Sequence, residues 1–211
     1  MAKMANIANI NIAIFGSTNG TSITRLLEEY TNNNLIGLQI PFIFSNRKNS
    51  GILEKASKYN IKGIHIQYDT NITRNEYDEK LSKLLVDNKV DYVLLVGYMK
   101  IITNVLLDKW ENKLVNIHPS LLPAFANMMN KSVHKAVLDR GCKITGATLM
   151  YVDESVDGGP IIDQRVVQVE CDDTVDTLKE KVQSLEGEML LDYVQNLIIY
   201  YNFIIILFKK I

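Results

Sequence analysis

Short apolar runs alternate with amphipathic segments along the first half of the chain. The runs have the length of buried strands and are bounded by turn residues; they cover residues 10–15, 39–45, 63–66 and 92–96. Three segments with helical periodicity lie between these runs. The first has its apolar positions at Ile23, Leu26, Leu27 and Tyr30, the second covers residues 52–59, and the third has its apolar positions at Tyr77, Leu81, Leu84 and Leu85. This series predicts an open, mostly parallel α/β sheet with right-handed crossovers and helices on both faces. Ligands of such a sheet bind at the carboxyl ends of its strands.

The second half of the chain departs from this regular series. A strand is predicted at residues 114–117, and two longer extended runs follow near residues 145–152 and 161–169. The turn around Gly158 and Gly159 is too short for a helical crossover, so we predict an antiparallel hairpin that extends the sheet. A last helix is predicted to begin at Asp173 or Thr174, which are good N-cap residues, and its apolar seam consists of Val175, Leu178, Val182, Leu185 and Met189.

The two ends of the chain differ from the region between them. Residues 1–9 lack the apolar stretch and cleavage site of a secretory signal, and we interpret them as a short leader. Residues 198–211 form a tail that is apolar except for Asn202 and its last lysines, and it is shorter than the roughly 20 apolar residues of a membrane span. We expect this tail to pack as a last helix or strand, with a membrane-surface or oligomer contact as the alternative. Residues 10–197 are predicted to form a single domain.

Composition narrows the classes of function. Hydrophobic residues make up 47% and charged residues 22%, which is typical of a globular protein. The formal net charge is −1, so no overall field attracts nucleic acid or an anionic membrane, and an anionic ligand has to be held locally. Cys142 and Cys171 lie in no CxxC motif or Cys/His cluster, which argues against a disulfide framework or a zinc site. We expect a cytoplasmic protein with small-molecule partners, without nucleic acid or a membrane span.

The first predicted strand ends in a turn of small and hydroxyl residues, Gly16-Ser-Thr-Asn-Gly-Thr-Ser22. The free N–H groups at the start of the following helix suit a phosphate. The segment lacks the Gly-Lys-Ser/Thr ending of a P-loop and the GxGxxG order of a dinucleotide-binding turn. An ordinary tight turn with a Thr or Ser cap is the alternative interpretation.

One of the three histidines lies at a predicted strand end. Asn116 and His118 share one face of the strand 114–117 by the period of two, and Pro119 stops the strand directly after them. Two polar side chains at the carboxyl end of a strand indicate an active site in this architecture. A capping Asn and a structural His at a sheet edge are the alternative. We interpret His65 and His134 as structural.

An acidic loop with two glycines, Val152-Asp-Glu-Ser-Val-Asp-Gly-Gly-Pro160, separates the two long extended runs. Asp157 next to Gly158 is compatible with a plain hairpin turn. The functional interpretation is that the Asp157 carboxylate hydrogen-bonds His118 and raises the pKa of its ring, which would make the two an acid/base pair. The spacing in sequence does not decide between these two interpretations.

These segments resemble the signature of the folate-dependent formyltransferases. The likeness rests on Asn116-Ile-His118-Pro-Ser-Leu-Leu-Pro and on Val152-Asp-Glu-Ser-Val-Asp157-Gly-Gly-Pro-Ile, and it runs from Ile10 to about Leu197. It implies a Rossmann-like formyltransferase fold with a phosphate-binding half, 10–96, and a folate-binding and catalytic half, 97–197. Within the family, the chain is most similar to the members that formylate 5′-phosphoribosylglycinamide in purine (IMP) synthesis, with 10-formyltetrahydrofolate as co-substrate.

The resemblance also implies site residues at the matching positions. For the ribonucleotide they are Gly20, Thr21, Ser22, Gln183 and Glu186. For the folate they are Arg74, Met99, Lys100, Ile101, Ile102, Asn116, Asp153, Glu154, Ser155, Val156 and Asp157. Glu186 lies beside apolar Val182 and Met189 on the predicted helix, and an inward-facing charge needs a partner.

The catalytic residues implied by the resemblance are Asn116, His118 and Asp157. Asn116 and a protonated His118 would stabilise the negative formyl oxygen, and Asp157 would keep His118 protonated near neutral pH. The implied reaction is direct formyl transfer in a monomer or homodimer, with no metal and no covalent enzyme intermediate.

Several positions depart from the family pattern. Met150 stands in the strand before the acidic loop where the family has a histidine, and Lys100 stands in place of an arginine, so it keeps the charge but loses the planar fork. Asn127 and Met128 replace a small, glycine-containing pair, which affects loop flexibility. Asn116, His118 and Asp157 are retained, so we expect activity.

Other functions fit parts of the same pattern. Methionyl-tRNA formyltransferase would need a further carboxyl-terminal domain and a basic surface, and formyltetrahydrofolate deformylase would need a further amino-terminal domain; we expect neither. A sugar-nucleotide formyltransferase is a closer alternative, although Gly20 and Glu186 favour the ribonucleotide. The remaining alternatives are a non-catalytic folate- or nucleotide-binding protein and a structural α/β module.

Overall fold

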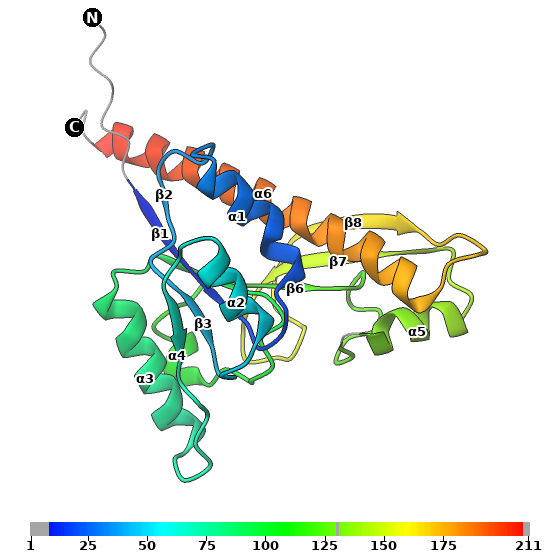
Figure 1. The fold of residues 1–211 in the computed structure, drawn as a ribbon, viewed down its shortest axis with the longest axis horizontal. Helices are drawn as coiled ribbons and strands as arrows, with labels where there is room; N and C mark the ends of the chain where they lie inside the picture. Colours follow the sequence, from blue (N-terminus) through cyan, green and yellow to red (C-terminus); the bar gives the residue numbers. More distant parts are fainter. Residues whose placement is uncertain (1–8, 130, 209–211) are drawn as a thin grey trace, which may run out of the picture.

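The computed structural model describes residues 9–129 and 131–208, and the strands among them form one mixed sheet (Figure 1). The strand order is β4-β3-β1-β5-β6-β7-β8, with β2 paired to β1. The strands are β1 (Ile10–Phe15), β2 (Leu38–Gln39), β3 (Ile43–Ser45), β4 (Gly63–His65), β5 (Tyr92–Leu95), β6 (Leu114–His118), β7 (Ile144–Tyr151) and β8 (Ile161–Gln168). Pairing is parallel from β4 to β6 and antiparallel from β6 to β8. The predicted open α/β sheet and its antiparallel extension are confirmed.

Helices cover both faces of the sheet. They are η1 (Thr21–Ile23), α1 (Thr24–Thr31), α2 (Gly51–Lys58), α3 (Arg74–Asp87), α4 (Asn104–Leu107), α5 (Lys131–Asp139) and α6 (Val175–Phe208). Alternate residues of β1 pack on opposite sides, because side chains of a strand alternate in direction. Ile12 and Ile14 join the core under α1, α2 and α6, whereas Ala13 and Phe15 join the core under α3 and α4.

The prediction of one strand at residues 39–45 was wrong, because the structure divides this run into β2 and β3. Pro41 lies between them and has no N–H for a ladder hydrogen bond. The pairing with β1 shows one extra residue between β2 and β3. Asn11 pairs with Gln39 and Ile14 pairs with Ile43, so three steps along β1 correspond to four steps from β2 to β3. The short helix α4 was also not predicted.

Helix α6 includes both the predicted last helix and most of the apolar tail. Its start is confirmed, since the Thr174 hydroxyl accepts a hydrogen bond from the N–H of Thr177 at 3.2 Å, as an N-cap residue does. The helix continues to Phe208, with Ile198 buried and Ile199 exposed. None of the helices in residues 9–129 and 131–208 is long and apolar enough to cross a membrane. Residues 1–8 of the predicted leader and 209–211 of the tail lie outside the described residues.

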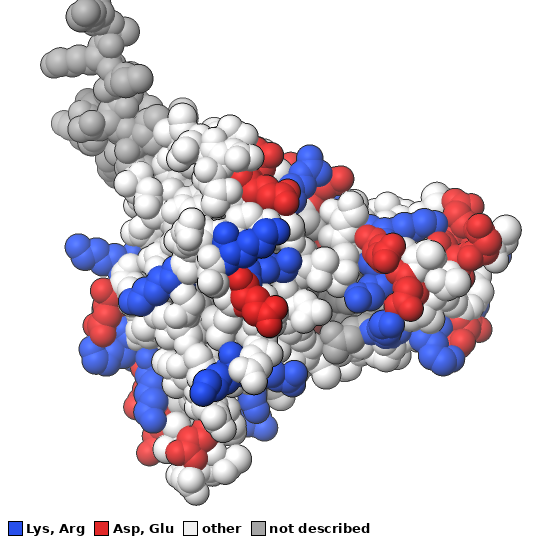
Figure 2. Space-filling view, in the orientation of Figure 1, with Lys and Arg blue, Asp and Glu red and all other residues white. Residues whose placement is uncertain are grey.

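Positive and negative side chains are mixed on the face of the surface shown in Figure 2. Lysine and arginine side chains alternate there with aspartate and glutamate side chains, in accord with the formal net charge of −1. The uncharged area lies toward the C-terminal end of α6. Binding of an anionic substrate therefore depends on local groups.

Candidate active site

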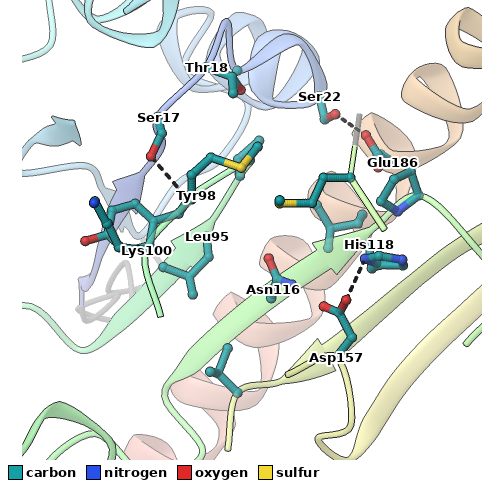
Figure 3. Close-up of a pocket in the computed structure, with 18 of the residues that line it drawn as sticks. Ser17, Thr18, Ser22, Leu95, Tyr98, Lys100, Asn116, His118, Asp157 and Glu186 are labelled. Carbon is teal, nitrogen blue, oxygen red and sulfur yellow. Dashed lines mark hydrogen bonds and ion pairs between the residues drawn. The ribbon is translucent and has the colours of Figure 1, made fainter. Parts of the chain in front are cut away.

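A cavity of about 740 Å³ opens at the carboxyl ends of β1, β5 and β6 (Figure 3). This is the position at which parallel α/β sheets bind ligands, and the volume suits small-molecule substrates. The predicted site residues that line it are Gly20, Thr21, Ser22, Met99, Lys100, Ile101, Ile102, Asn116, His118, Asp153, Glu154, Ser155, Val156, Asp157, Gln183 and Glu186. Segments far apart in sequence thus meet around one space, and the roles of the individual residues stay predictions.

Arg74 is the one predicted site residue that the cavity does not include. It begins α3 and lines a smaller neighbouring pocket of about 180 Å³ together with Tyr68 and Asp78. The two pockets share Met99, Lys100 and Ile101 as lining residues. The Lys100 ammonium lies 4.1 Å from the centre of the Tyr68 ring, a cation–π distance. A ligand that extends from the cavity over Lys100 would therefore reach Arg74.

The turn after β1 forms one wall of the cavity. Gly20 has φ +57°, in the left-handed region that favours glycine, and η1 begins directly after it. A side chain here would also be crowded, since an added Cβ would lie 2.7 Å from Cγ1 of Ile52. The left-handed turn therefore requires glycine at this position, and Thr21 and Ser22, which follow it, line the cavity.

Glu186 faces this turn from α6. Its side chain is 6% exposed, and the Ser22 hydroxyl donates a hydrogen bond to Oε2 of Glu186. Burial raises the pKa of the Glu186 carboxyl to about 7, and the hydrogen bond from Ser22 lowers it only in part. Near neutral pH the free protein therefore holds this group as a mixture of acid and carboxylate. The inward orientation predicted from the helical spacing is confirmed.

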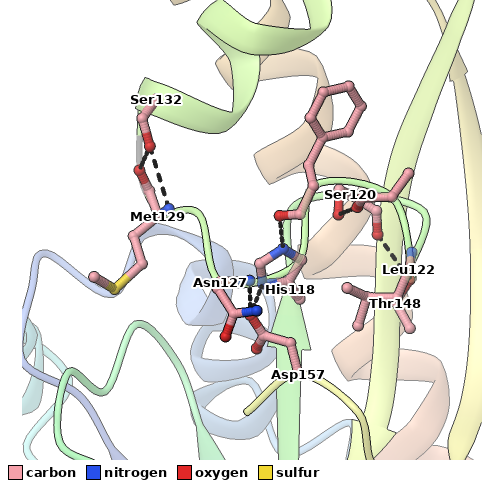
Figure 4. Close-up of polar contacts among 10 residues, drawn as sticks. His118, Ser120, Leu122, Asn127, Met129, Ser132, Thr148 and Asp157 are labelled. Atoms are coloured by element: carbon pink, nitrogen blue, oxygen red, sulfur yellow. Dashed lines mark hydrogen bonds and ion pairs between the residues drawn. The ribbon is translucent and has the colours of Figure 1, made fainter.

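His118 and Asp157 meet on the opposite wall (Figures 3 and 4). His118 Nδ1 lies 3.4 Å from Oδ2 of Asp157, and Nε2 lies 3.3 Å from the backbone oxygen of Phe125. Asp157 also accepts a hydrogen bond of 2.9 Å from the N–H of Asn127. Asp157 has φ +57°, which Asp tolerates better than most residues, so the tip of the acidic loop turns its carboxylate toward the ring. The predicted contact between His118 and Asp157 is confirmed.

Asp157 raises the pKa of the His118 ring, as predicted, but it does not offset the burial of the ring, and the net pKa in the free protein lies below its ordinary value. Burial lowers the pKa of the His118 ring, and the Asp157 carboxylate and the Phe125 carbonyl raise it by less. The geometry nevertheless matches the protonated ring, because both ring nitrogens face acceptors and only the imidazolium can donate from both. A new negative charge in the cavity would shift the balance toward this form.

Asn116 and His118 lie two residues apart on β6 and both line the cavity. Met150 pairs with Asn116 across the β6–β7 ladder and is 2% exposed, so it fills space against the amide and offers it no hydrogen bond of imidazole type. The next pair on the same face is His118 and Thr148.

Thr148 organises the loop after β6, which the sequence did not reveal (Figure 4). Its hydroxyl donates to the backbone oxygen of Ser120 at 2.7 Å and accepts from the N–H of Leu122 at 3.0 Å and from Nε2 of Gln164 at 2.9 Å. This network fixes the loop whose later part carries Phe125, the partner of His118.

His134 and Lys179 also line the cavity, although neither was predicted as a site residue. His134 is 2% exposed, and burial together with the nearby Lys179 lowers its pKa to about 4. Lys179 lies four residues before Gln183 and seven before Glu186, so helical spacing alone places the three on one face of α6. That spacing is the signal by which the sequence could have revealed Lys179.

The cavity lies at the carboxyl ends of the strands, where the pairing of the sheet changes from parallel to antiparallel at β6. The family model "Formyl transferase" matches residues 10–194. The chain belongs to the formyl transferase family.

Individual relatives narrow the comparison. The chain is 35% identical over 177 residues to the trifunctional purine biosynthetic protein adenosine-3 of Gallus gallus, an alignment that covers 84% of this chain and 17% of that protein. The chain thus spans about a sixth of the length of that relative. It resembles glycinamide ribonucleotide transformylase 1 from Symbiobacterium toebii (TM-score 0.83, 29% identity, 90% and 88% of the two chains). It also resembles phosphoribosylglycinamide formyltransferase from Bacillus halodurans (TM-score 0.81, 30% identity, 89% and 94%).

Proposed function

We propose that this protein transfers the formyl group of 10-formyltetrahydrofolate to the amine of 5′-phosphoribosylglycinamide, a step of purine synthesis. The observation that carries the proposal is a single cavity with a turn suited to phosphate on one wall and the Asn116, His118 and Asp157 cluster on the other. Support comes from the family membership and from structures of glycinamide ribonucleotide transformylases that cover most of the chain.

The ribonucleotide occupies the side of the cavity formed by η1 and α6. Its phosphate binds the N–H groups of Gly20, Thr21 and Ser22, and Gln183 and Glu186 bind the ribose. A ribose hydroxyl that donates to Glu186 stabilises the carboxylate form, so ribonucleotide binding lowers the pKa of this group. The amine then points along the cavity toward Asn116 and His118.

The folate occupies the side formed by residues 99–102 and the acidic loop. The pterin lies between this segment and residues 153–157, and the carboxylates of the tail extend over Lys100 toward Arg74 in the smaller pocket. This direction is set by the residues that the two pockets share. The formyl group on N10 then lies at the centre, next to Asn116.

The reaction is a direct transfer between the two substrates, with no metal and no covalent enzyme intermediate. The amine forms a bond to the formyl carbon, and the carbonyl electron pair moves onto the formyl oxygen. Asn116 and protonated His118 donate hydrogen bonds to this oxygen, and each such donor is typically worth about 3–4 kcal/mol. The oxygen then re-forms its double bond, the bond to N10 breaks, and N10 takes the proton released by the amine.

His118 changes partners during this step. Its contact to the Phe125 oxygen, at 3.3 Å, is long for an N–H···O hydrogen bond, and we expect Nε2–H to exchange it for the formyl oxygen. The negative charge on that oxygen raises the pKa of the ring and opposes the effect of burial. Asp157 holds Nδ1–H and thereby orients the ring.

A monomer or homodimer is the assembly expected for the proposed function. The free cysteines Cys142 and Cys171 support a cytoplasmic location as part of the proposal.

The test is a spectrophotometric formyl-transfer assay with 10-formyltetrahydrofolate or its 10-formyl-dideazafolate analogue, with and without the ribonucleotide. Turnover that depends on the ribonucleotide supports the proposal. Formate release without that dependence would replace it with hydrolysis of the folate. A folded sample that shows neither reaction would contradict it and favour another acceptor or a binding protein.

A further inference from the structure

Ser17 lies in the turn after β1, lines the cavity and is 1% exposed. Its hydroxyl accepts a hydrogen bond of 2.9 Å from the backbone N–H of Met99, drawn as the dashed line from Ser17 in Figure 3. The same hydroxyl donates a hydrogen bond of 2.5 Å to Oδ1 of Asn46. Its own N–H donates to the backbone oxygen of Gly97 at 3.0 Å. One serine thus joins the ends of three neighbouring strands, β1, β3 and β5.

The segment that Ser17 holds has no regular secondary structure. Residues 98–103 belong to no helix or strand, yet five of them line the cavity. At the far end of this segment the N–H of Thr103 donates to Oδ2 of Asp78 at 2.7 Å. The Ser17 hydroxyl is the corresponding attachment at the near end, so it sets where residues 99–102 stand relative to the phosphate turn.

A hydroxyl suits this position because it accepts and donates at the same time. The Met99 N–H and the Asn46 side-chain oxygen each obtain a partner from it, and Asn46 is only 8% exposed. An alanine would leave the Met99 N–H and the Asn46 side-chain oxygen without this partner, and the segment would lose its attachment to the turn.

We propose that Ser17 is a positioning residue that ties the folate-binding segment to the turn that binds the ribonucleotide phosphate. This inference rests on the proposed function, because it takes residues 99–102 as the folate side of the cavity. The Ser17 hydroxyl acts through the backbone of Met99, and Asn46 acts through Ser17 by fixing the direction of its O–H. The placement of the folate is thereby tied to the same turn that receives the other substrate.

The main test is Ser17→Ala, with Ser82→Ala as the matched control. Ser82 is 3% exposed and lies in α3 outside the cavity, so it controls for the loss of a buried serine hydroxyl. We expect Ser17→Ala to raise the KM for the formyl folate about 10-fold, in line with the loss of a buried hydrogen bond. The ribonucleotide KM should change less than about 3-fold and the pH profile should stay the same, while Ser82→Ala changes none of these.

A double-mutant cycle with Asn46→Ala tests the relay itself. Because Asn46 acts through the Ser17 hydroxyl, Asn46→Ala alone should raise the folate KM about 3-fold, and adding it to Ser17→Ala should raise it no further. Calorimetric binding of the 10-formyl-dideazafolate analogue gives the same comparison without turnover. If Ser17→Ala does not fold, Asn46→Ala still carries the test.

The outcomes separate this inference from the proposed function. A wild-type protein that neither binds the folate analogue nor formylates the ribonucleotide would overturn the proposed function. A wild-type protein that does both, with a Ser17→Ala variant that matches Ser82→Ala, would overturn the relay alone. Equal increases in both KM values, or additive effects of the two substitutions, would also overturn it.

Discussion

Asp157 and Glu186 both line the cavity, and the surroundings of their carboxyl groups differ. Asp157, at the tip of the acidic loop, is 12% exposed at its side chain and has the His118 ring and the Asn127 N–H as partners. Glu186, inside α6, is almost fully buried and has one hydroxyl, that of Ser22, as its partner. Burial with this single neutral partner raises the pKa of Glu186 to about 7.

The difference shows how one cavity can use two carboxyl groups for different purposes. Asp157 has a neighbour that can become cationic, because the His118 ring can take a proton beside it. Glu186 lacks such a partner within the described residues, and a ribose hydroxyl would complete its hydrogen bonds. Asp157 can therefore pair with a charge that forms within the protein, whereas Glu186 would gain a further hydrogen-bond partner only from a bound ligand.

Replacing Asp157 should have the largest effect. Asp157→Asn keeps the size of the side chain and an oxygen for the Asn127 N–H, but removes the charge beside His118. Since the carboxylate raises the pKa of the ring against the effect of burial, that pKa falls further in the variant. We expect kcat to fall about 10²- to 10⁴-fold, and the limb on which activity is lost with rising pH should move to lower pH.

The formyl-transfer assay between pH 5 and 9 measures this effect. Asp192→Asn serves as a control, because Asp192 pairs with Arg165 away from the cavity. A variant of Asp157 with a lower kcat but an unchanged pH profile would mean that the carboxylate does not act on the ionisation of His118.

Replacing Glu186 should affect binding more than chemistry. Glu186→Gln keeps a hydrogen-bonding side chain but cannot become a carboxylate, so we expect the ribonucleotide KM to rise about 10- to 100-fold. The KM for the folate should change less than about 3-fold, because the proposed folate side of the cavity does not include Glu186. Equal increases in both KM values would show that Glu186 has only a structural role.

The same variant should change stability with a defined sign. The folded pKa of Glu186, about 7, lies above the ordinary value of 4.5, so between these values the folded state keeps a proton that the unfolded state loses. Stability contributed by the protonated group is present at low pH and lost as pH rises, up to roughly 3 kcal/mol above pH 7. Thermal unfolding should show Glu186→Gln more stable than the wild type at pH 8 and equal to it near pH 4.5.

Removing the partner of Glu186 should have a smaller effect. Ser22→Ala takes away the hydrogen bond that lowers the pKa of Glu186, so that pKa rises further. We expect the ribonucleotide affinity to fall about 3- to 10-fold near pH 7 and to recover in part at higher pH, where the carboxyl ionises. Titration calorimetry at pH 6.5 and 8.5 measures the change. An affinity loss independent of pH would contradict the link between the two residues.

The smallest effect is expected for Met150→Leu. Met150 packs against Asn116 with 2% of its surface exposed, and a volume-conserving apolar exchange typically costs less than about 1.5 kcal/mol. Activity should stay within about 2-fold of the wild type in the same assay. A larger loss of activity would show that the Met150 sulfur itself contributes to the function of the neighbouring Asn116.

The elements predicted from periodicity agree well with the structure where the pattern of nearby residues alone decides which side chains are buried. The strand at residues 10–15 and the helix that buries Leu26 and Leu27 are present as predicted, because both depend on neighbouring residues. The interruption at Pro41 was missed, since an apolar run reads as one strand until its pairing with β1 is known. The network around Thr148 was missed because its partners lie 16 to 28 residues away.

The sequence by itself determined the alternation of strands and helices in the first half of the chain, the glycine turn at Gly20 and the polar pair of Asn116 and His118. These features follow from spacing and residue type along the chain. Only the tertiary structure decided that Asp157 reaches His118, that Ser22 is the partner of Glu186, and that Ser17 holds Met99. It also decided the direction in which the pKa of His118 shifts: burial lowers this pKa despite the neighbouring Asp157 carboxylate. Contacts and desolvation depend on distances in space, which spacing along the chain does not specify.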